Sequence, residues 1–386
     1  MTNEIPFKNE QVTSFVNMLK NELPDTRDNR GKRHTLAFVV VAFVLATLTG
    51  RQKLSSIHRH ICNRLYWLHE LTQIQTTRPI SRAHLPRLLS GLDWAVLDKL
   101  IERCFGVRIQ QNEEQKWVAI DGKTLRGTLD GGDKQSLVLA VAHESGEVVG
   151  QARQVGSKSS EIPVVRTLLK ETGLEKQKVS LDAHHCNPET TSQIHKAGGI
   201  YLTQVKENQE VLLQQCKALD ASQPPLAEII EHDKANGRVT TRRAQLFSMV
   251  SLSLAPRWMD SALSACLIVE RETFELAKQK TTVDTSYYVS NQVISASTIQ
   301  ATAKELTQAV RRHWGVESGN WIRDVTFGED LVKTKVANQA QIMGRLRSLS
   351  IALLRKTKVK NFQAAIEKFV DSASALESML RQVNFL

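Results

Sequence analysis

The sequence has few cysteines, and they are irregularly spaced. Its 386 residues include five, none of which forms a Cys-x-x-Cys pair with another: Cys62, Cys104, Cys186, Cys216 and Cys266. An odd number without paired spacing argues against a disulfide framework and against a structural zinc site, and it indicates a reducing compartment. We therefore expect a cytoplasmic protein.

The sequence also lacks a secretory signal and an apolar run of membrane length. Its first residues show no basic segment followed by an apolar one. The most apolar run, residues 36–48, is about two-thirds as long as a bilayer requires. We interpret this run as a buried helix, with a membrane anchor as the alternative. Internal repeats and low-complexity tracts are absent as well.

Positive charge is present in excess and is unevenly distributed. The net charge is +11. Residues 1–110 hold 16 Lys and Arg against 9 Asp and Glu, and residues 304–360 hold 12 against 5, so the remaining residues are net acidic. Two basic flanks around an acidic centre fit a DNA-binding protein with metal-binding acids at its centre. The alternative is that the basic residues only form solvated helix faces.

The first 110 residues have a helical pattern. Apolar residues recur at helical spacing, as at Ile57, Ile61, Leu65 and Leu68, and residues 88–105 read as one further helix. Short basic helices joined by tight turns are typical of a DNA-reading helix-turn-helix unit, although ordinary helical packing explains the same pattern. We predict an all-helical N-terminal domain that contacts DNA.

From Trp117 the pattern changes to strands and helices. The predicted order is three antiparallel strands, helix, strand, helix, strand and helix, over residues 117–120, 137–142, 147–155, 161–172, 179–182, 188–197, 201–205 and 209–219. This is the order of a ribonuclease-H-like core, in which the first and fourth strands are neighbours. The expected fold class is α/β, a ribonuclease-H-like catalytic core with a β-rich insertion, preceded by the helical domain.

Two aspartates follow strands of this core. Asp121 comes at the end of the first strand, just before a glycine, and Asp182 ends the fourth. If these strands are neighbours, the two carboxylates lie side by side. Lys123 and Arg126 follow Asp121, and acids held beside basic residues suit a metal ion together with a phosphate. The alternative is that Asp121 only caps a turn.

The last helix of the core carries a third acid. Three β-like runs, over residues 238–248, 265–271 and 286–289, form the predicted insertion before it. Leu306, Val310, Trp314 and Glu317 then share one face of a helix. A carboxylate at the end of a core-facing apolar stripe is costly to bury alone, but it is reasonable if it shares a divalent ion with other acids. A Glu that reaches solvent from the edge of the stripe is the alternative.

Five short motifs occur in an order that resembles one known family. They are Ile120-Asp121-Gly122-Lys123, Leu181-Asp182-Ala183-His184, Val205-Lys206-Glu207-Asn208-Gln209, His313-Trp314-Gly315-Val316-Glu317 and Asp324-Val325-Thr326-Phe327-Gly328-Glu329-Asp330. Together they resemble the H-repeat-associated DDE transposases, the ISAs-type insertion-sequence family. The resemblance covers nearly the whole chain.

The resemblance implies a ribonuclease-H-like fold in which Asp121, Asp182 and Glu317 are catalytic and bind Mg²⁺ or Mn²⁺. It implies hydrolysis at a transposon end and attack of the exposed 3′-OH on target DNA, with two metal ions about 4 Å apart. The implied partners are double-stranded DNA, at the transposon ends and at the target, and a second copy of the chain in a homodimer on DNA. We expect no membrane partner and a location at the bacterial nucleoid.

Polar and aromatic residues near the three acids are the predicted DNA contacts. They are Lys123, Arg126, Lys206, Asn208 and Trp314. For the three basic residues, a plain surface charge is the alternative. His184, His185 and Cys186 follow Asp182 and could suggest zinc, but neighbours on an extended segment point to opposite faces and no second ligand pair is near them.

The sequence departs from the family pattern at several positions. Glu317 is followed by Ser318-Gly319-Asn320-Trp321, and Glu207 stands where the family usually has Gly. At the spacings of a related Tyr-Arg-Glu-Lys signature the chain has Val310, His313, Glu317 and Asp324, so DNA-end contacts do not transfer from that signature. Glu329 is the rival third ligand.

Two other functions remain open. The altered motif at residues 318–320 fits a DNA-binding protein that has lost catalysis, and a metal-dependent nuclease without strand transfer would use the same acids.

The expected domains of the chain are a helical domain over 1–110, the first part of the core over 111–220, a β-rich insertion over 221–300, the last core helices over 301–360 and a C-terminal helix over 361–386.

Overall fold

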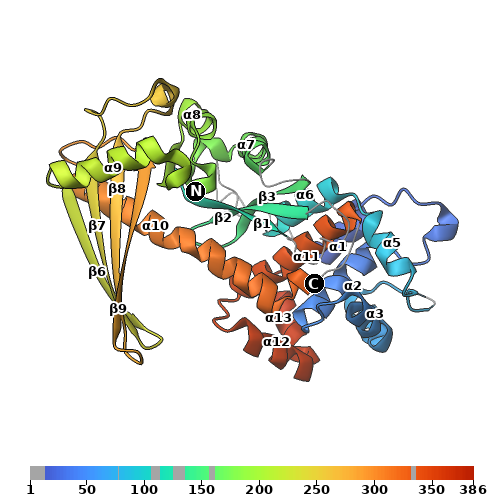
Figure 1. Cartoon of the computed structure of the whole chain (residues 1–386). Helices are drawn as coiled ribbons and strands as arrows, with labels where there is room; N and C mark the ends of the chain where they lie inside the picture. Colours follow the sequence, from blue (N-terminus) through green and yellow to red (C-terminus); the bar gives the residue numbers. More distant parts are fainter. Residues whose placement is uncertain (1–13, 77, 106–113, 125–134, 156–160, 332–335) are drawn as a thin grey trace, which may run out of the picture. The chain divides into compact units, whose positions relative to one another are not determined.

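The computed structural model describes residues 14–76, 78–105, 114–124, 135–155, 161–331 and 336–386 (Figure 1). The chain divides into two compact units. One comprises Met1–Arg108, Leu125–Asp133 and Trp321–Leu386, and the other comprises Ile109–Thr124 and Lys134–Asn320. We call the first the helical unit and the second the sheet unit.

The helical unit is built from both ends of the chain. Its described helices are α1 (Phe15–Glu22), α2 (Leu36–Leu48), α3 (Leu54–Asn63), α4 (Leu65–Thr72), α5 (His84–Ser90), α6 (Trp94–Phe105), α11 (Ala337–Lys356), α12 (Phe362–Asp371) and α13 (Ala373–Gln382). Helix α11 packs against α2, α5 and α6. The hydrophobic core of this unit therefore joins segments that are far apart in the sequence.

Helix α2 lies at the centre of the helical unit. All of its residues are buried, and the Thr35 side chain caps it by accepting a hydrogen bond from the N–H of Phe38 at 3.2 Å. A helix that is apolar on every side must be surrounded by other protein. The prediction of a buried helix at residues 36–48 is confirmed. None of the described helices is long and apolar enough to cross a membrane.

Two predictions of single helices are wrong. Residues 88–105 are divided between α5 and α6, because Asp93 accepts hydrogen bonds from the N–H groups of Ala95 and Val96 and so starts a second helix. The C-terminal segment likewise contains two helices, α12 and α13. Ser372 separates them, since its side chain accepts from the N–H of Ala375 and caps α13.

The sheet unit contains, in its described residues, one sheet of nine strands (Figure 1). They are β1 (Trp117–Thr124), β2 (Gln135–Ala142), β3 (Val148–Val155), β4 (Lys178–Leu181), β5 (Ile200–Val205), β6 (Ala227–Ala235), β7 (Arg238–Ser248), β8 (Ala265–Glu275) and β9 (Lys280–Ser290). Their order is β3-β2-β1-β4-β5-β9-β8-β7-β6. Strand β4 pairs in parallel with both β1 and β5, so the first and fourth strands are neighbours, as the sequence predicts.

Helices cover both faces of this sheet. One face of the sheet, which includes Val118 and Ile120, shares a hydrophobic cluster with α7 (Glu161–Thr172), α8 (Pro188–Lys196) and α9 (Glu210–Ser222). Helix α10 (Ile299–Trp321) packs on the other face, where Leu306 and Val310 meet Leu246 and Leu267. The unit therefore has three layers: α7, α8 and α9 on one face, the sheet in the middle, and α10 on the other face.

The strands of the predicted insertion extend the central sheet. Strand β9 pairs antiparallel with β5, and β8 and β9 are longer than the sequence indicates. Strand β6 is not predicted at all. Within the described sheet it pairs with β7 alone and is therefore an edge strand. Its charged and polar residues interrupt the alternation of apolar and polar residues by which a strand is recognised in a sequence.

Candidate active site

Asp121 and Asp182 lie side by side where two parallel strands meet. In the register of β1 and β4, Ile120 pairs with Leu181, so the two aspartates come next in the same row. Asp121 is half-buried, and the side chain of Asp182 is 44% exposed. The strands therefore place two carboxylates next to one another, within reach of solvent.

Alternation along the strands determines which face these carboxylates occupy. The hydroxyl of Ser180 lies 2.8 Å from Nδ1 of His313 on α10. Asp182 comes two residues later in extended conformation, so its side chain points to the same face as that of Ser180. Asp121 shares the row of Asp182. By this alternation we infer that both side chains belong to the face that α10 covers, and Oδ1 of Asp182 also lies 4.0 Å from Nε2 of His185.

Hydrogen bonds hold the backbone around Asp182. Its Oδ1 accepts from the N–H of His185 at 3.2 Å, so the carboxylate caps the short helix η5 (Ala183–His185). The Thr203 hydroxyl donates to the Asp182 carbonyl at 3.1 Å. The Asn208 amide donates to the carbonyl of Ala183 at 2.7 Å. These bonds fix the orientation of Asp182 within the protein itself, and they give Asn208 a structural contact at the site.

A buried pair of side chains supports the two strand ends from the opposite face. The carboxylate of Glu161, the first residue of α7, accepts from Nε2 of His185 at 3.0 Å, and His185 is fully buried. A Cβ added to Gly122 would overlap this carboxylate, so Glu161 lies directly against the backbone of the residue after Asp121. The Glu161–His185 pair thus touches the chain next to Asp121 and next to Asp182.

Three polar side chains connect the sheet to α10. Ser180, which is 2% exposed, has its hydroxyl 2.8 Å from Nε2 of His143 and 2.8 Å from Nδ1 of His313. Burial lowers the pKa of His143 to about 3. Burial also lowers the pKa of His313, and the Asp182 carboxylate opposes that shift. Both shifts favour the neutral imidazoles, and a serine hydroxyl can form a hydrogen bond with each ring because it has one donor and two acceptor positions.

A second contact anchors α10 further from the aspartates. Glu305 accepts from Nε1 of Trp117 at 2.9 Å and pairs with Lys178. Trp117 and Lys178 form one row of the sheet. Ser180, two residues along β4, is the residue that contacts His313. Glu305 and the later residue His313 of α10 thus contact Lys178 and the later residue Ser180 of β4, so the helix runs along the sheet in the same direction as β4.

The remaining predicted residues differ in how they are placed. Glu317 belongs to α10, but its side chain, that of Lys123 and the whole of Arg126 lie outside the described residues. Lys206 is exposed directly after β5. Among the side chains that the structure describes, no group of three or more His, Cys, Asp or Glu has the geometry of a metal site.

The prediction that Trp314 continues the core-facing stripe of α10 is wrong. Leu306 and Val310 are buried, whereas Trp314 is 49% exposed. The guanidinium of Arg271 lies over its ring, 5.8 Å from the centroid. The hydrophobic cluster on this face of the sheet includes Val310 but not Trp314, so the tryptophan is left at the rim.

Glu329, the rival third acid, is buried within the helical unit. It is 1% exposed and lies 3.9 Å from Nη1 of Arg323, which is itself buried. Burial lowers the pKa of Arg347 to about 10, and the Glu329 carboxylate opposes this shift. Glu329 therefore compensates the charge of two buried guanidinium groups.

Comparison with known families identifies the class of protein. Residues 113–351 match the family described as transposase DDE domain, and residues 19–104 match the family described as DDE_Tnp_1-associated. The first match covers more than half of the chain. The chain belongs to the DDE transposase family.

Relatives narrow this class. "Putative transposase YncI" of Escherichia coli O157:H7 is 26% identical over 355 residues, which are 87% of this chain and 86% of the relative. "H repeat-associated putative transposase YhhI" of Escherichia coli strain K12 is 24% identical over 378 residues, 94% of this chain and 95% of the relative. The resemblance to the H-repeat-associated transposases is confirmed.

Sequence reasoning missed the polar residues that support the aspartates. Ser180 is a polar residue within a short buried strand, and a polar residue in such a position indicates a buried hydrogen bond. Glu161 at the start of a helix has the ordinary pattern of an acid near a helix N-terminus, so nothing distinguishes it in the sequence. His143 follows a strand at a turn, where a histidine is unremarkable.

Proposed function

We propose that this chain is a metal-dependent DDE transposase that cleaves the DNA ends of an insertion element and joins the exposed 3′-OH to target DNA. The observation that carries the proposal is the shared row of Asp121 and Asp182 on the face covered by α10. Membership of the DDE transposase family supports it independently.

The strand order supports a ribonuclease-H-like core. Strands β1, β2 and β3 form an antiparallel meander, and β4 and β5 continue the sheet in parallel from β1. Helices α7 and α8 connect the parallel strands on one face, and α10 lies on the other. This is the arrangement that the sequence pattern predicts for such a core.

The contacts of α10 support Glu317 as the third acid. His313 contacts Ser180, which lies two residues before Asp182. One helical turn from His313 to Glu317 advances about 6 Å, which is close to the advance of about 7 Å between alternate residues of a strand. Since both elements run in the same direction, we infer that Glu317 approaches the row of Asp121 and Asp182. Glu329 has buried arginine partners instead.

The donor set fits a hard divalent cation. Asp121, Asp182 and Glu317 offer only carboxylate oxygens, which Mg²⁺ and Mn²⁺ prefer. Two such ions, when bound, activate the attacking oxygen and stabilise the leaving one. The chain contributes the rest: the capping bond to His185 N–H orients Asp182, and the neutral His313 adds no positive charge beside the carboxylates. Exposed Lys206, after β5, is a candidate phosphate contact.

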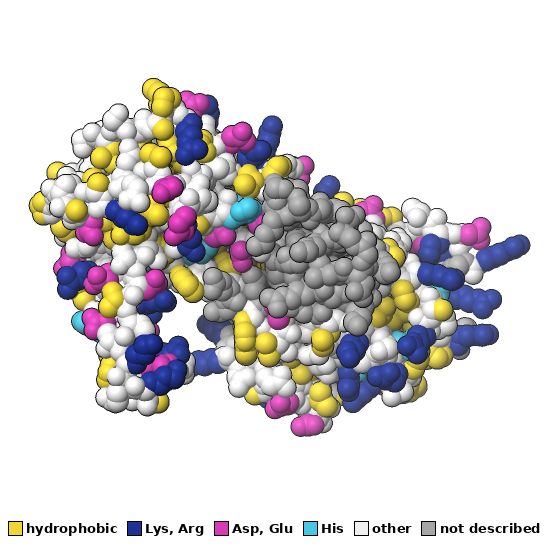
Figure 2. Space-filling view, in the orientation of Figure 1, with side chains coloured by type: hydrophobic (Ala, Val, Ile, Leu, Met, Phe, Trp, Pro, Cys, Tyr) yellow, Lys and Arg dark blue, Asp and Glu magenta, His cyan; other side chains and the backbone are white. Residues whose placement is uncertain are grey.

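The helical unit contributes a second DNA contact in this proposal. Figure 2 shows Lys and Arg side chains gathered on the surface of this unit. The exposed ones on and around α3, α4 and α5 include Arg51, Lys53, Arg59, Arg64, Arg82 and Arg87. Such a surface attracts the phosphate backbone without reading sequence. A homodimer on DNA remains part of the proposal, because two element ends must be brought together.

The test measures cleavage and joining by the full-length protein with Mg²⁺ and duplex DNA that carries the ends of the element. We expect Asp121→Asn, Asp182→Asn and Glu317→Gln each to lower the rate of both steps by at least about a hundredfold, because a lost carboxylate removes a metal ligand. Asp260→Asn is the matched control, since within the described part of the chain this exposed acid of the sheet unit forms an ion pair with Lys196 alone.

The outcomes distinguish the candidate functions. Undiminished nicking by Asp121→Asn would refute the proposal. Wild-type protein that nicks but never joins strands would be a nuclease, and wild-type protein that binds DNA without nicking would be a transposase-derived binding protein. A rise in melting temperature with Mn²⁺ that Asp182→Asn abolishes would support the metal site without relying on DNA.

A further inference from the structure

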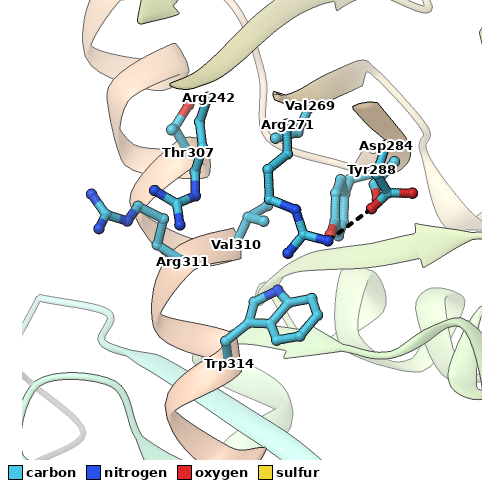
Figure 3. Close-up of a pocket in the computed structure, with 10 residues that line it drawn as sticks. Arg242, Val269, Arg271, Asp284, Tyr288, Thr307, Val310, Arg311 and Trp314 are labelled. Carbon is cyan, nitrogen blue, oxygen red and sulfur yellow. Dashed lines mark hydrogen bonds and ion pairs between the residues drawn. The ribbon is translucent and has the colours of Figure 1, made fainter. Parts of the chain in front are cut away.

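A pocket lined by arginines lies between the β7–β9 strands and α10. Its volume is about 260 Å³, and its lining includes Arg242 of β7, Arg271 of β8, and Arg311 and Trp314 of α10. Figure 3 shows Arg271 reaching over the indole of Trp314, with Arg242 and Arg311 beside it. Arginine and an exposed aromatic ring are the side chains that nucleic-acid sites combine.

The arginines of this pocket are arranged unfavourably for stability alone. Arg242 and Arg271 are direct cross-strand partners, and like charges in that position repel. The pKa of Arg242 is lowered by burial and then by the charge of Arg311, with Arg271 contributing in the same direction. Nη1 of Arg242 is buried and makes no hydrogen bond in the described part of the chain. An anion in the pocket would relieve this repulsion.

Acidic neighbours compensate the arginines only in part. Asp284 lies 3.2 Å from Arg271, and Glu231 lies 2.8 Å from Arg311. The side chains of Arg271 and Asp284 are 42% and 61% exposed, so this solvent-accessible pair contributes little and a phosphate can displace it. The acid nearest to Arg242 is Asp233 at 3.8 Å, which is too far for a hydrogen bond.

The pocket continues into a trough along the same face of the strands. A second hollow shares Arg242 and Arg271 with it and extends to the ends of the hairpins. The register places Thr240, Thr273 and Thr282 in the next row on the same face, two residues along each strand, and Arg238, Glu275 and Lys280 two residues beyond them. Figure 2 shows Lys and Arg gathered at the far end of these strands. We call the whole surface, from Trp314 to Lys280, the arginine trough.

We propose that the arginine trough binds the sugar–phosphate backbone of a DNA strand, with phosphates held by Arg242, Arg271 and Arg311. Threonine hydroxyls of the next row donate to further phosphate oxygens, and the Trp314 ring packs against a sugar or base. A row of donors that continues over several residues fits a polymer better than a free phosphate. That the polymer is DNA rests on the proposed function, whereas the phosphate chemistry follows from the trough.

The test is the binding of the full-length protein to fluorescein-labelled DNA of mixed sequence, single-stranded and duplex, without divalent metal. Affinity is measured over a range of salt concentrations for Arg242→Gln, Arg271→Gln and the double variant. We expect the double variant to bind roughly a hundredfold more weakly at low salt, and the slope of log affinity against log salt to fall by about two, because two phosphate contacts are lost.

The matched control is Arg243→Gln. Arg243 is the next residue on β7, so its side chain lies on the opposite face of the sheet, where it is half-exposed and 3.7 Å from Glu228. We expect affinity and salt slope to remain at the wild-type values. The Arg271 side chain is 42% exposed, so its single variant is the milder test of binding, and circular dichroism verifies that it folds.

The results separate this inference from the proposed function. Wild-type affinity and slope in both Arg271→Gln and the double variant would overturn the arginine trough and leave the metal site untouched. Full competition by millimolar inorganic phosphate at constant ionic strength would assign the pocket to a free anion and would also overturn it. Wild-type protein that binds no DNA would instead contradict the proposed function.

Discussion

Replacing Ser180 by alanine removes the hydroxyl through which the sheet holds α10. In the folded protein this hydroxyl bonds both His143 and His313 at 2.8 Å. Ser180 is 2% exposed, so water cannot take its place. The variant therefore leaves two imidazole nitrogens without their partner in the interior of the sheet unit.

The expected loss of stability follows from that geometry. An unsatisfied buried polar atom costs about 1–3 kcal/mol, and alanine itself fits the space of serine without a large cavity. For two such atoms we expect the free energy of unfolding to fall by about 2–6 kcal/mol. Cleavage should fall as well, because His313 is one helical turn from Glu317 on α10.

Urea denaturation followed by circular dichroism measures this effect. We expect a lower midpoint with an unchanged m-value, which indicates a change in stability rather than in the surface exposed. Ser251→Ala, at an exposed turn of the same unit, is the control and should change stability by less than about 0.5 kcal/mol. A Ser180→Ala variant as stable as this control would refute the hydrogen-bonded chain and the anchoring of α10 that we derive from it.

Two further predictions concern the surroundings of the same site. Gly122→Ala should lower the free energy of unfolding by about 1–3 kcal/mol, because its Cβ overlaps the Glu161 carboxylate, which must shift away from His185. In a double-mutant cycle Glu161→Ala should relieve much of this loss, and strictly additive effects would contradict the contact. The pKa of His143 is about 3 in the folded protein against 6.5 as its ordinary value, so the unfolded state binds more protons between these values. Stability should therefore fall as the pH is lowered from 6.5 towards 3, by at most about 1.4 kcal/mol per pH unit from this residue, and His143→Gln should reduce that slope in melting experiments.

The sequence was sufficient to predict that β1 and β4 are neighbours. The apolar runs before Asp121 and Asp182 are recognisable because a strand buried on both faces reads as a run of apolar residues. The prediction that the first strand ends at Asp121 is wrong, because β1 continues to Thr124 by pairing with β2. The strand and helix order then constrains which strands are neighbours, since parallel strands need crossover helices. The buried helix at residues 36–48 was predictable for the same reason, because its composition leaves no polar face.

The residues that sequence reasoning missed depend on contacts between distant segments. Trp314 is exposed because the hydrophobic cluster between α10 and the sheet ends at Val310. Helical spacing shows that Trp314 shares a face with Val310, but it does not show where the sheet stops covering that face. The pairing of Arg242 with Arg271 depends on the register of β7 and β8, and register is set by turns and by packing across the whole sheet. Glu161 and His185 lie on different elements and are joined only in the folded chain.

The polar chain between the sheet and α10 is more informative for function than for stability. Apolar contacts such as those of Leu306 and Val310 hold a helix against a sheet but tolerate small shifts along its axis. A hydrogen bond at 2.8 Å between Ser180 and His313 is directional, so it fixes the position of the helix at one residue. That residue is one turn from Glu317. Because apolar side chains of the same volume could fill this space at no energetic cost, the buried polar chain is best explained by the need to hold α10 in one position relative to the two aspartates.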